Sequence, residues 1–192
     1  ASFTEFGKNL SLGVTILRSE GKEYLEEEEN SALQNALDKL SEQIDTFNLS
    51  ELNEANLQAA LKVDAALGRL ILKVGIEKFS KGQLAESLGI FLFLTLVNPE
   101  EPDYWFRFGL VAKECEEYRI ALNALATASE LAPTFIGAYI YAAYCHLQLG
   151  AKESAMVELA KAKKIHENSA VEERWQQHLI DIEELIATVS TT

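Results

Sequence analysis

The stretch that decides the fold is residues 105–133, WFRFGLVAKECEEYRIALNALATASELAP. It recurs along the chain, because a shift of 34 residues places Gly109 on Ala143 and Pro99 on Pro133. Self-similarity at a fixed period of this length is typical of stacked helix–turn–helix units. One such unit cannot bury its apolar face alone, so neighbouring units share a core. The sequence therefore predicts an all-α fold that contains three helix pairs.

The period and the residue types resemble the tetratricopeptide (TPR) pattern, W-x2-L-G-x2-Y…A-x3-F…P. The middle copy matches best, with Trp105, Phe108, Gly109, Ala121, Leu125, Ala128 and Pro133 at the pattern positions. Small residues at 109 and 121 let two antiparallel helices approach closely, and large side chains fill the space between them. Proline ends the second helix because it cannot continue the hydrogen-bond ladder. The alternative is a helical bundle with accidental spacing.

We predict helix pairs at 69–80 with 83–97, 103–115 with 118–131, and 136–149 with 152–166, followed by a terminal helix at 170–188. These pairs would form a short right-handed solenoid. A solenoid needs a cap on its last exposed face. The terminal helix can supply it through an apolar stripe of Trp175, Leu179, Ile182 and Ile186. The predicted domains are 1–67 (an N-terminal helical segment), 68–168 (three TPR repeats) and 169–192 (capping helix and tail).

The first 67 residues differ from the repeats, since they hold 13 acidic and 5 basic side chains, a net charge of −8. They predict amphipathic helices at 3–17 and 51–66. Between these two lies a stripe with heptad spacing, formed by Leu33, Leu37, Leu40 and Ile44. Such a stripe fits either a helix folded back on the repeats, or a dimer contact or a lid on a groove. The acidic run at 26–29 predicts a solvated turn or linker.

Composition excludes several functions. With 17 basic and 30 acidic residues, the formal net charge is −13, which repels nucleic acids and anionic membranes. No apolar run is long enough to span a bilayer, and no signal peptide is evident. Cys115 and Cys145 fit a reducing compartment and small apolar roles. No catalytic, phosphate-binding or metal-ligating spacing occurs, so we expect no enzymatic activity, no cofactor and no metal.

The first helix of each pair carries the functional prediction. In stacked TPR units its fifth, ninth and twelfth positions usually line a concave groove. Eight of the nine residues at these positions are apolar or aromatic, namely Leu72, Ile76, Phe79, Phe106, Leu110, Ile140, Tyr144 and Leu147, and the ninth is Lys113. An exposed surface this apolar indicates a peptide-binding groove. The alternative is that the N-terminal helices or the terminal helix fill it.

The same face excludes one familiar TPR ligand, the C-terminal carboxylate of heat-shock chaperones. That ligand requires a clamp of cations and amides. Leu72, Ile76, Gly137 and Tyr141 stand at four of its five positions, and only Arg107 is polar. A protein client with apolar anchors is therefore the expected partner.

Three TPRs between an N-terminal helical segment and a terminal helix, with a sequence pI of about 4.7, resemble the class II chaperones of bacterial type III secretion (the SycD/LcrH type). The similar stretches are 70–82 (LILKVGIEKFSKG), 104–118 (YWFRFGLVAKECEEY), 142–155 (AAYCHLQLGAKESA) and 159–163. The resemblance implies a bacterial cytoplasmic chaperone, associated with virulence. It would hold a secreted translocator in its groove and keep it soluble before export, and many members dimerise through N-terminal helices.

Two other functions stay open on the sequence. One is a general TPR scaffold, whose partner would be a folded protein. The other is a chaperone of a needle or filament subunit, whose client would be small and helical.

Overall fold

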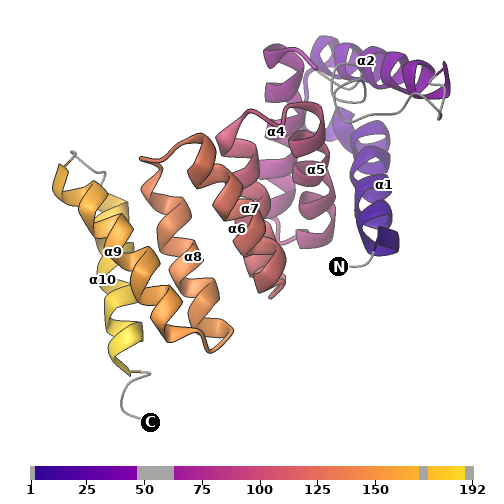
Figure 1. The fold of residues 1–192 in the computed structure, drawn as a ribbon. Helices are drawn as coiled ribbons and strands as arrows, with labels where there is room; N and C mark the ends of the chain where they lie inside the picture. Colours follow the sequence, from indigo (N-terminus) through magenta and orange to yellow (C-terminus); the bar gives the residue numbers. More distant parts are fainter. Residues whose placement is uncertain (1–2, 47–62, 169–172, 189–192) are drawn as a thin grey trace. The chain divides into compact units, whose positions relative to one another are not determined.

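The computed structural model describes residues 3–46, 63–168 and 173–188, and within these ranges every regular element is a helix (Figure 1). The helices are α1 (Phe3–Glu20), the 3-10 turn η1 (Gly21–Glu23), α2 (Glu27–Thr46), α4 (Ala65–Ser80), α5 (Leu84–Val97), α6 (Pro102–Glu114), α7 (Tyr118–Leu131), α8 (Ile136–Gln148), α9 (Lys152–Asn168) and α10 (Glu173–Thr188). The prediction of an all-α fold with three helix pairs is confirmed, with helix ends within a few residues of those expected.

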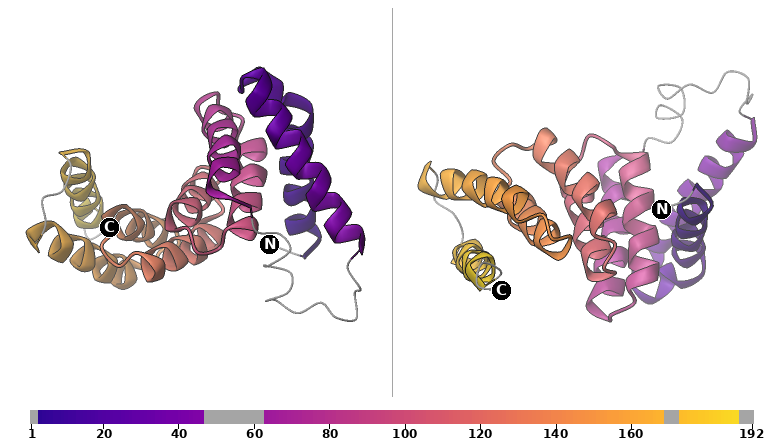
Figure 2. Two further views of the ribbon diagram at one scale, coloured as in Figure 1. Left: turned by 90° about the horizontal axis from the view of Figure 1, so that it is seen from above. Right: turned by 60° about the horizontal axis from the view of Figure 1, so that its bottom comes forward.

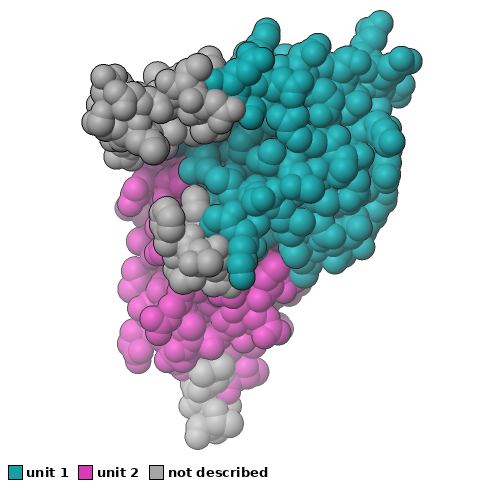
Figure 3. Space-filling model, turned by 90° about the vertical axis from the view of Figure 1, so that its right-hand side faces the viewer, with its two compact units in different colours: residues 1–100 teal, residues 101–192 magenta. Residues whose placement is uncertain are grey.

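The chain divides into two compact units, residues 1–100 and 101–192, coloured separately in Figure 3. Unit 1 combines α1 and α2 with the first helix pair, α4 and α5. Unit 2 holds the second and third pairs and α10. The predicted helix at 51–66 lies outside the described residues except for its last few positions, where α4 begins at Ala65.

In unit 1, α1 packs against α5 through two glycines. A Cβ atom added to Gly13 would lie 2.3 Å from the backbone carbonyl of Gly89, and one added to Gly89 would lie 2.3 Å from the carbonyl oxygen of Asn9. The two backbones are therefore in direct contact, which only glycine permits. On another side, α5 packs against α4, where the Ser87 hydroxyl donates a 3.0 Å hydrogen bond to the Gly75 carbonyl. Partners on two sides explain why α5 is apolar nearly all round.

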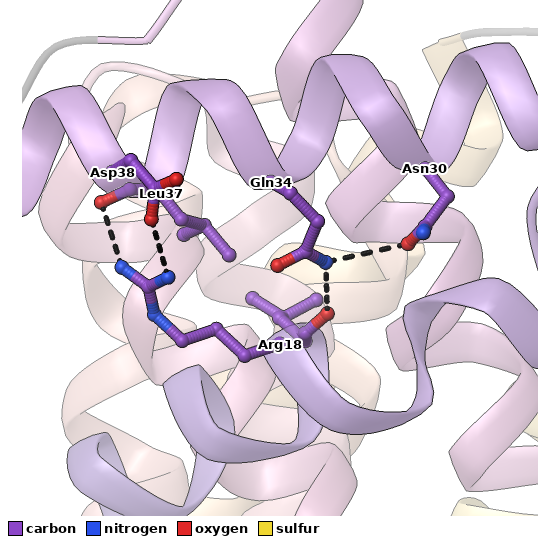
Figure 4. A network of polar contacts seen from close by, with 6 residues as sticks. Arg18, Asn30, Gln34, Leu37 and Asp38 are labelled. Carbon is purple, nitrogen blue, oxygen red and sulfur yellow. Dashed lines mark hydrogen bonds and ion pairs between the residues drawn. The ribbon is translucent and has the colours of Figure 1, made fainter.

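Polar contacts join α1 to α2 (Figure 4). Arg18 donates to an Asp38 carboxylate oxygen at 2.6 Å and to the Leu37 carbonyl at 3.0 Å. Further along, the Gln34 amide donates to the Leu17 carbonyl at 3.0 Å. Gln34 of α2 thus binds a carbonyl near the end of α1, and Arg18 of α1 binds a carbonyl within α2, so the two helices are held together from both sides.

The prediction of a solvated turn or linker at the acidic run 26–29 is wrong, because residues 27–29 form the start of a helix. Glu27 begins α2, and the carboxylate of Glu29 accepts a 3.0 Å hydrogen bond from the backbone N–H of Glu26. That bond satisfies one of the free donors of the first turn. Negative charge at a helix N-terminus is also stabilised by the helix dipole, so consecutive glutamates favour helix at this point. The bond, together with Lys73, lowers the pKa of Glu29.

A buried cation joins η1 and α1 to α4. The Lys78 side chain has no exposed surface, forms an ion pair with Glu20, and lies 5.3 Å from the Tyr24 ring centroid. Burial alone would lower the pKa of the Lys78 ammonium, but its hydrogen bonds to Glu20 and Tyr24 outweigh burial and raise it. The lysine is therefore charged and paired, as a buried charge must be.

In unit 2, small residues meet large ones across each helix pair, as the repeat pattern predicts. A Cβ added to Gly109 on α6 would lie 2.9 Å from the Leu125 side chain on α7. Ala143 and Ala155 are buried on α8 and α9, and Leu159 is 7% exposed. After the last pair, α10 (yellow in Figure 2) lies beside α9 and α8. It buries the predicted stripe of Trp175, Leu179, Ile182 and Ile186.

Candidate functional site

In unit 1, the candidate site is the outward face of α4. Leu72 and Phe79 are half-buried and Ile76 is 37% exposed, so all three side chains reach solvent. They follow at intervals of four and three residues, which places them on one face of the helix. Unit 1 thus presents a short apolar stripe from its first repeat.

In unit 2, the five predicted site residues differ in exposure. Leu110 on α6 and Tyr144 on α8 are half-buried and accessible. Phe106, Ile140 and Leu147 are 8%, 1% and 8% exposed. The buried three can meet a client only if the side chains that cover them move.

Lys113 joins α6 to α8 on this face. Its ammonium lies 5.2 Å from the ring centroids of both Tyr141 and Tyr144, and 2.5 Å from a carboxylate oxygen of Glu114. Only 13% of its side chain is exposed. A cation held between aromatic faces is stabilised by about 0.5–2 kcal/mol per contact. Lys113 therefore orients the two tyrosines and is not free to grip a carboxylate.

Two observations describe the electrostatics near this cluster. Burial raises the pKa of the Tyr141 hydroxyl, and the Lys113 ammonium opposes that rise. Arg107, the one polar residue at the clamp positions, is held by Asp103 at 2.6 Å. Both cations, Lys113 and Arg107, already have partners, so neither is free to bind the carboxylate at a peptide end. The site therefore offers apolar and aromatic contacts.

Sequence reasoning missed part of the site, namely the aromatic cluster that covers Phe106. The Phe106 ring lies 4.5 Å from Phe135, 5.9 Å from Tyr141 and 6.2 Å from Trp175, measured between centroids. Trp175 belongs to α10, so part of the terminal helix lies over the first helices of both pairs of unit 2. The apolar stripe on α10 predicted that Trp175 is buried. Nothing in the sequence identified the residues that it packs against.

The residues predicted as a dimer or lid contact lie on α2. Leu33, Leu37 and Leu40 are 0%, 3% and 7% exposed within unit 1, where Leu33 lies against Gly21. Ile44 also lies on α2, but its side chain is outside the described set. The three buried leucines form part of the core of unit 1, and the dimer or lid role stays a prediction.

The remaining reactive side chains are inert or scattered. Burial raises the pKa of Cys145 to about 12, and burial with nearby glutamates raises that of Cys115. Among the described residues, no group of three or more His, Cys, Asp or Glu side chains could hold a metal ion. No helix within the described ranges has the length and apolar character needed to cross a membrane.

No protein-family model matches the chain, and the comparison with curated proteins finds no match. Solved structures do match its fold. The type III secretion chaperone SycD of Yersinia enterocolitica, in complex with a peptide of the translocator YopD, aligns with a TM-score of 0.61 at 14% identity, covering 66% of this chain and 97% of that one. PcrH, in complex with the chaperone binding region of PopD, aligns with a TM-score of 0.58 at 18% identity, covering 74% and 99%.

A TPR structure bound to a different kind of peptide also matches. The first TPR of Spaghetti (RPAP3), bound to an HSP90 peptide, aligns with a TM-score of 0.56 at 16% identity over 65% of this chain and 97% of that one. At these identities the likeness establishes the TPR-like fold of secretion chaperones and of TPR domains generally. The choice of ligand must come from the residues of the site.

Proposed function

We propose that this chain is a non-enzymatic chaperone that binds an apolar segment of a secreted, translocator-type client on the first helices of its repeats. The client would be kept soluble in the bacterial cytoplasm before type III secretion. The observation that carries the proposal is the set of accessible apolar side chains on those helices, Leu72, Ile76, Phe79, Leu110 and Tyr144, in a fold shared with SycD and PcrH.

The physical basis is burial of apolar surface. Each Å² of apolar area removed from water contributes about 25 cal/mol, so a few anchor side chains on the client supply most of the binding free energy. A net charge of −13 keeps chaperone and complex apart from other copies. No nucleotide is required, because binding the unfolded client acts by mass action.

The carboxylate-clamp function of the HSP90-binding TPR fits this site poorly. A clamp needs free cations and amides, whereas Tyr141 is part of an aromatic cluster, Arg107 is paired with Asp103, and Leu72 and Ile76 are apolar. We therefore retain the apolar-client function over the clamp function.

The test is a pull-down from the native cell with tagged chain, in which mass spectrometry identifies the client. Tyr144→Glu and Ile76→Glu should each reduce client recovery at least tenfold, because each places a charge where an apolar anchor would bind. Both residues are accessible, so far-UV helicity should be unchanged. Phe106→Glu is a poorer choice, since Phe106 is 8% exposed and a carboxylate there would destabilise unit 2.

The matched control is Met156→Glu on α9, where the side chain is 51% exposed and lies off the first helices. It adds the same charge and should recover the client at the wild-type level. The proposal fails if Tyr144→Glu and Ile76→Glu also recover it at that level, or if the recovered partner is a folded protein with no exported, membrane-active segment.

A further inference from the structure

A niche for one aromatic side chain lies on the first helices of unit 2. The Trp175 indole fills it and is 9% exposed. Its floor is Gly137 on α8, where an added Cβ would lie 2.5 Å from the indole Cη2 atom. The ring thus rests directly on the α8 backbone, in space that any other residue at position 137 would occupy.

The walls of this niche are aromatic and come from outside α10. The rings of Phe106 and Tyr141 each lie 6.2 Å from the indole, at interplanar angles of 77°. Edge-to-face pairs of this kind contribute about 0.5–1.5 kcal/mol each beyond area burial. We call Phe106, Gly137 and Tyr141 the indole niche, a receptor whose shape and chemistry select a large aromatic side chain.

The niche is continuous with the accessible part of the candidate site. Tyr141 contacts both Trp175 and Lys113, and Lys113 in turn contacts Tyr144. Between Tyr144 and the indole, this chain of contacts passes through Lys113 and Tyr141 alone. Since the floor and walls already touch a single indole, a second ring cannot enter while Trp175 is present.

The helix that fills the niche is attached on one face alone. Apart from its buried stripe and the half-buried His178 and Leu185, α10 is exposed, and Ile180 is 48% exposed. An ion pair links Glu183 to Lys163 on α9, with side chains 54% and 40% exposed. Exposed pairs of this kind add little stability. Release of α10 would expose its apolar stripe, whereas the contacts of α6 with α7, of α7 with α8 and of α8 with α9 do not involve α10.

We propose that the indole niche is the receptor for an aromatic anchor of the client, and that Trp175 occupies it in the free chain as a built-in competitor. The inference rests on the proposed function, since it needs a client. A receptor that is open only a fraction of the time binds with its affinity reduced by that fraction, so one open about 1% of the time binds about 100-fold more weakly. Apolar capture is then restricted to clients that can displace α10.

The test uses the full chain and a fluorescent peptide of residues 173–188, ERWQQHLIDIEELIAT. By fluorescence anisotropy, Trp175→Ala should bind this peptide at least tenfold more tightly than the wild-type chain, because its niche is empty. The control peptide, with alanine at the position of Trp175, should bind neither protein. Equal binding by wild type and Trp175→Ala, or equal binding of both peptides, would overturn the proposal.

A second variant guards against simple loss of folding. Gly137→Ala fills the niche from its floor while Trp175 stays in the chain, so it should not bind the peptide even though α10 is displaced. In a Trp105→Phe background, where Trp175 is the only tryptophan, its emission should shift to longer wavelength in Gly137→Ala. Unshifted emission, or tight peptide binding by Gly137→Ala, would contradict a niche at this position.

Two further results distinguish this inference from the proposed function and from a dimer that exchanges α10. The peptide assay needs no client, so its failure leaves the proposed function standing, and failure of the pull-down leaves the niche standing. Light scattering should give the same mass for wild type and Trp175→Ala. A wild-type dimer that dissociates in Trp175→Ala would mean that the niche holds the α10 of a second copy, which overturns the proposal.

Discussion

At the scale of single residues, the turn inside each helix pair has one residue in the left-handed conformation, and in the middle pair that residue is not glycine. Gly82, Glu116 and Gly150 stand 34 residues apart, and all have positive φ, at 72°, 61° and 72°. The backbone N–H of Glu116 donates to the Lys113 carbonyl at 3.0 Å. The N–H of the next residue, Glu117, donates to the Ala112 carbonyl at 2.9 Å. These two bonds form a Schellman motif, which favours glycine at the left-handed position.

We predict that Glu116→Gly stabilises unit 2. A residue with a Cβ in this conformation costs about 1–2 kcal/mol, and glycine gives back part of that gain as entropy of the unfolded chain. The net increase in the free energy of unfolding should be about 0.5–1 kcal/mol in urea denaturation. Glu117→Gly is the control, because its φ of −80° needs no glycine, and it should lower stability. Equal losses in both variants would contradict strain at Glu116.

At the scale of elements, the contact between α1 and α5 is the least tolerant of change. Gly89→Ala would place a methyl group 2.3 Å from the carbonyl oxygen of Asn9, and 2.7 Å from the backbone nitrogen of Gly13. Backbone cannot yield as a side chain tip does, so α1 must move away from α5. Overpacking of this kind costs about 1–3 kcal/mol, and we expect a loss of that size in the free energy of unfolding, measured by far-UV circular dichroism in urea.

The matched control for Gly89→Ala is Gly7→Ala, also a helical glycine of unit 1. Nothing lies within 4 Å of a Cβ added to Gly7, so only helix propensity changes. That change favours alanine by up to about 1 kcal/mol. If both variants shift stability by the same amount in the same direction, close contact between the helices is not what Gly89 provides.

The repeat elements were predictable because each uses the same local spacing, and α7 begins and ends at the predicted residues 118 and 131. The elements outside the repeats were less so. The charge of residues 26–29 favoured a solvated turn, although glutamates also favour a helix N-terminus, and α2 begins there. The contacts of Gly13 with Gly89 and of Trp175 with Gly137 join segments far apart in sequence. Glycine has no side chain, so a glycine in the sequence gives no pattern that would identify the segment packed against it.

At the scale of the whole molecule, the acidic character and the apolar surface serve different parts of one task. The net charge of −13 lies on a chain whose first repeat leaves Ile76 37% exposed. Like charges repel copies of the chain, which under the proposed function would help to keep the accessible apolar side chains open to a client. Each compact unit would present accessible apolar side chains of its own, Ile76 in unit 1 and Tyr144 in unit 2.

We predict that the two units unfold separately, because each has its own buried core, with Ile71, Leu94 and neighbours in unit 1 and Leu125, Ala143 and neighbours in unit 2. Both tryptophans, Trp105 and Trp175, belong to unit 2. Tryptophan fluorescence therefore follows unit 2 alone, whereas circular dichroism follows both units.

Gly89→Ala should accordingly lower the urea midpoint of a circular dichroism phase and leave the tryptophan fluorescence midpoint unchanged. Gly109→Ala, whose Cβ would lie 2.9 Å from the Leu125 side chain in unit 2, should shift the fluorescence midpoint. If Gly89→Ala shifts both signals together, the chain unfolds as one cooperative unit. Separate transitions would instead show that unit 2 can lose its structure while the core of unit 1 stays folded, so a change confined to unit 2, such as the displacement of α10, need not loosen unit 1.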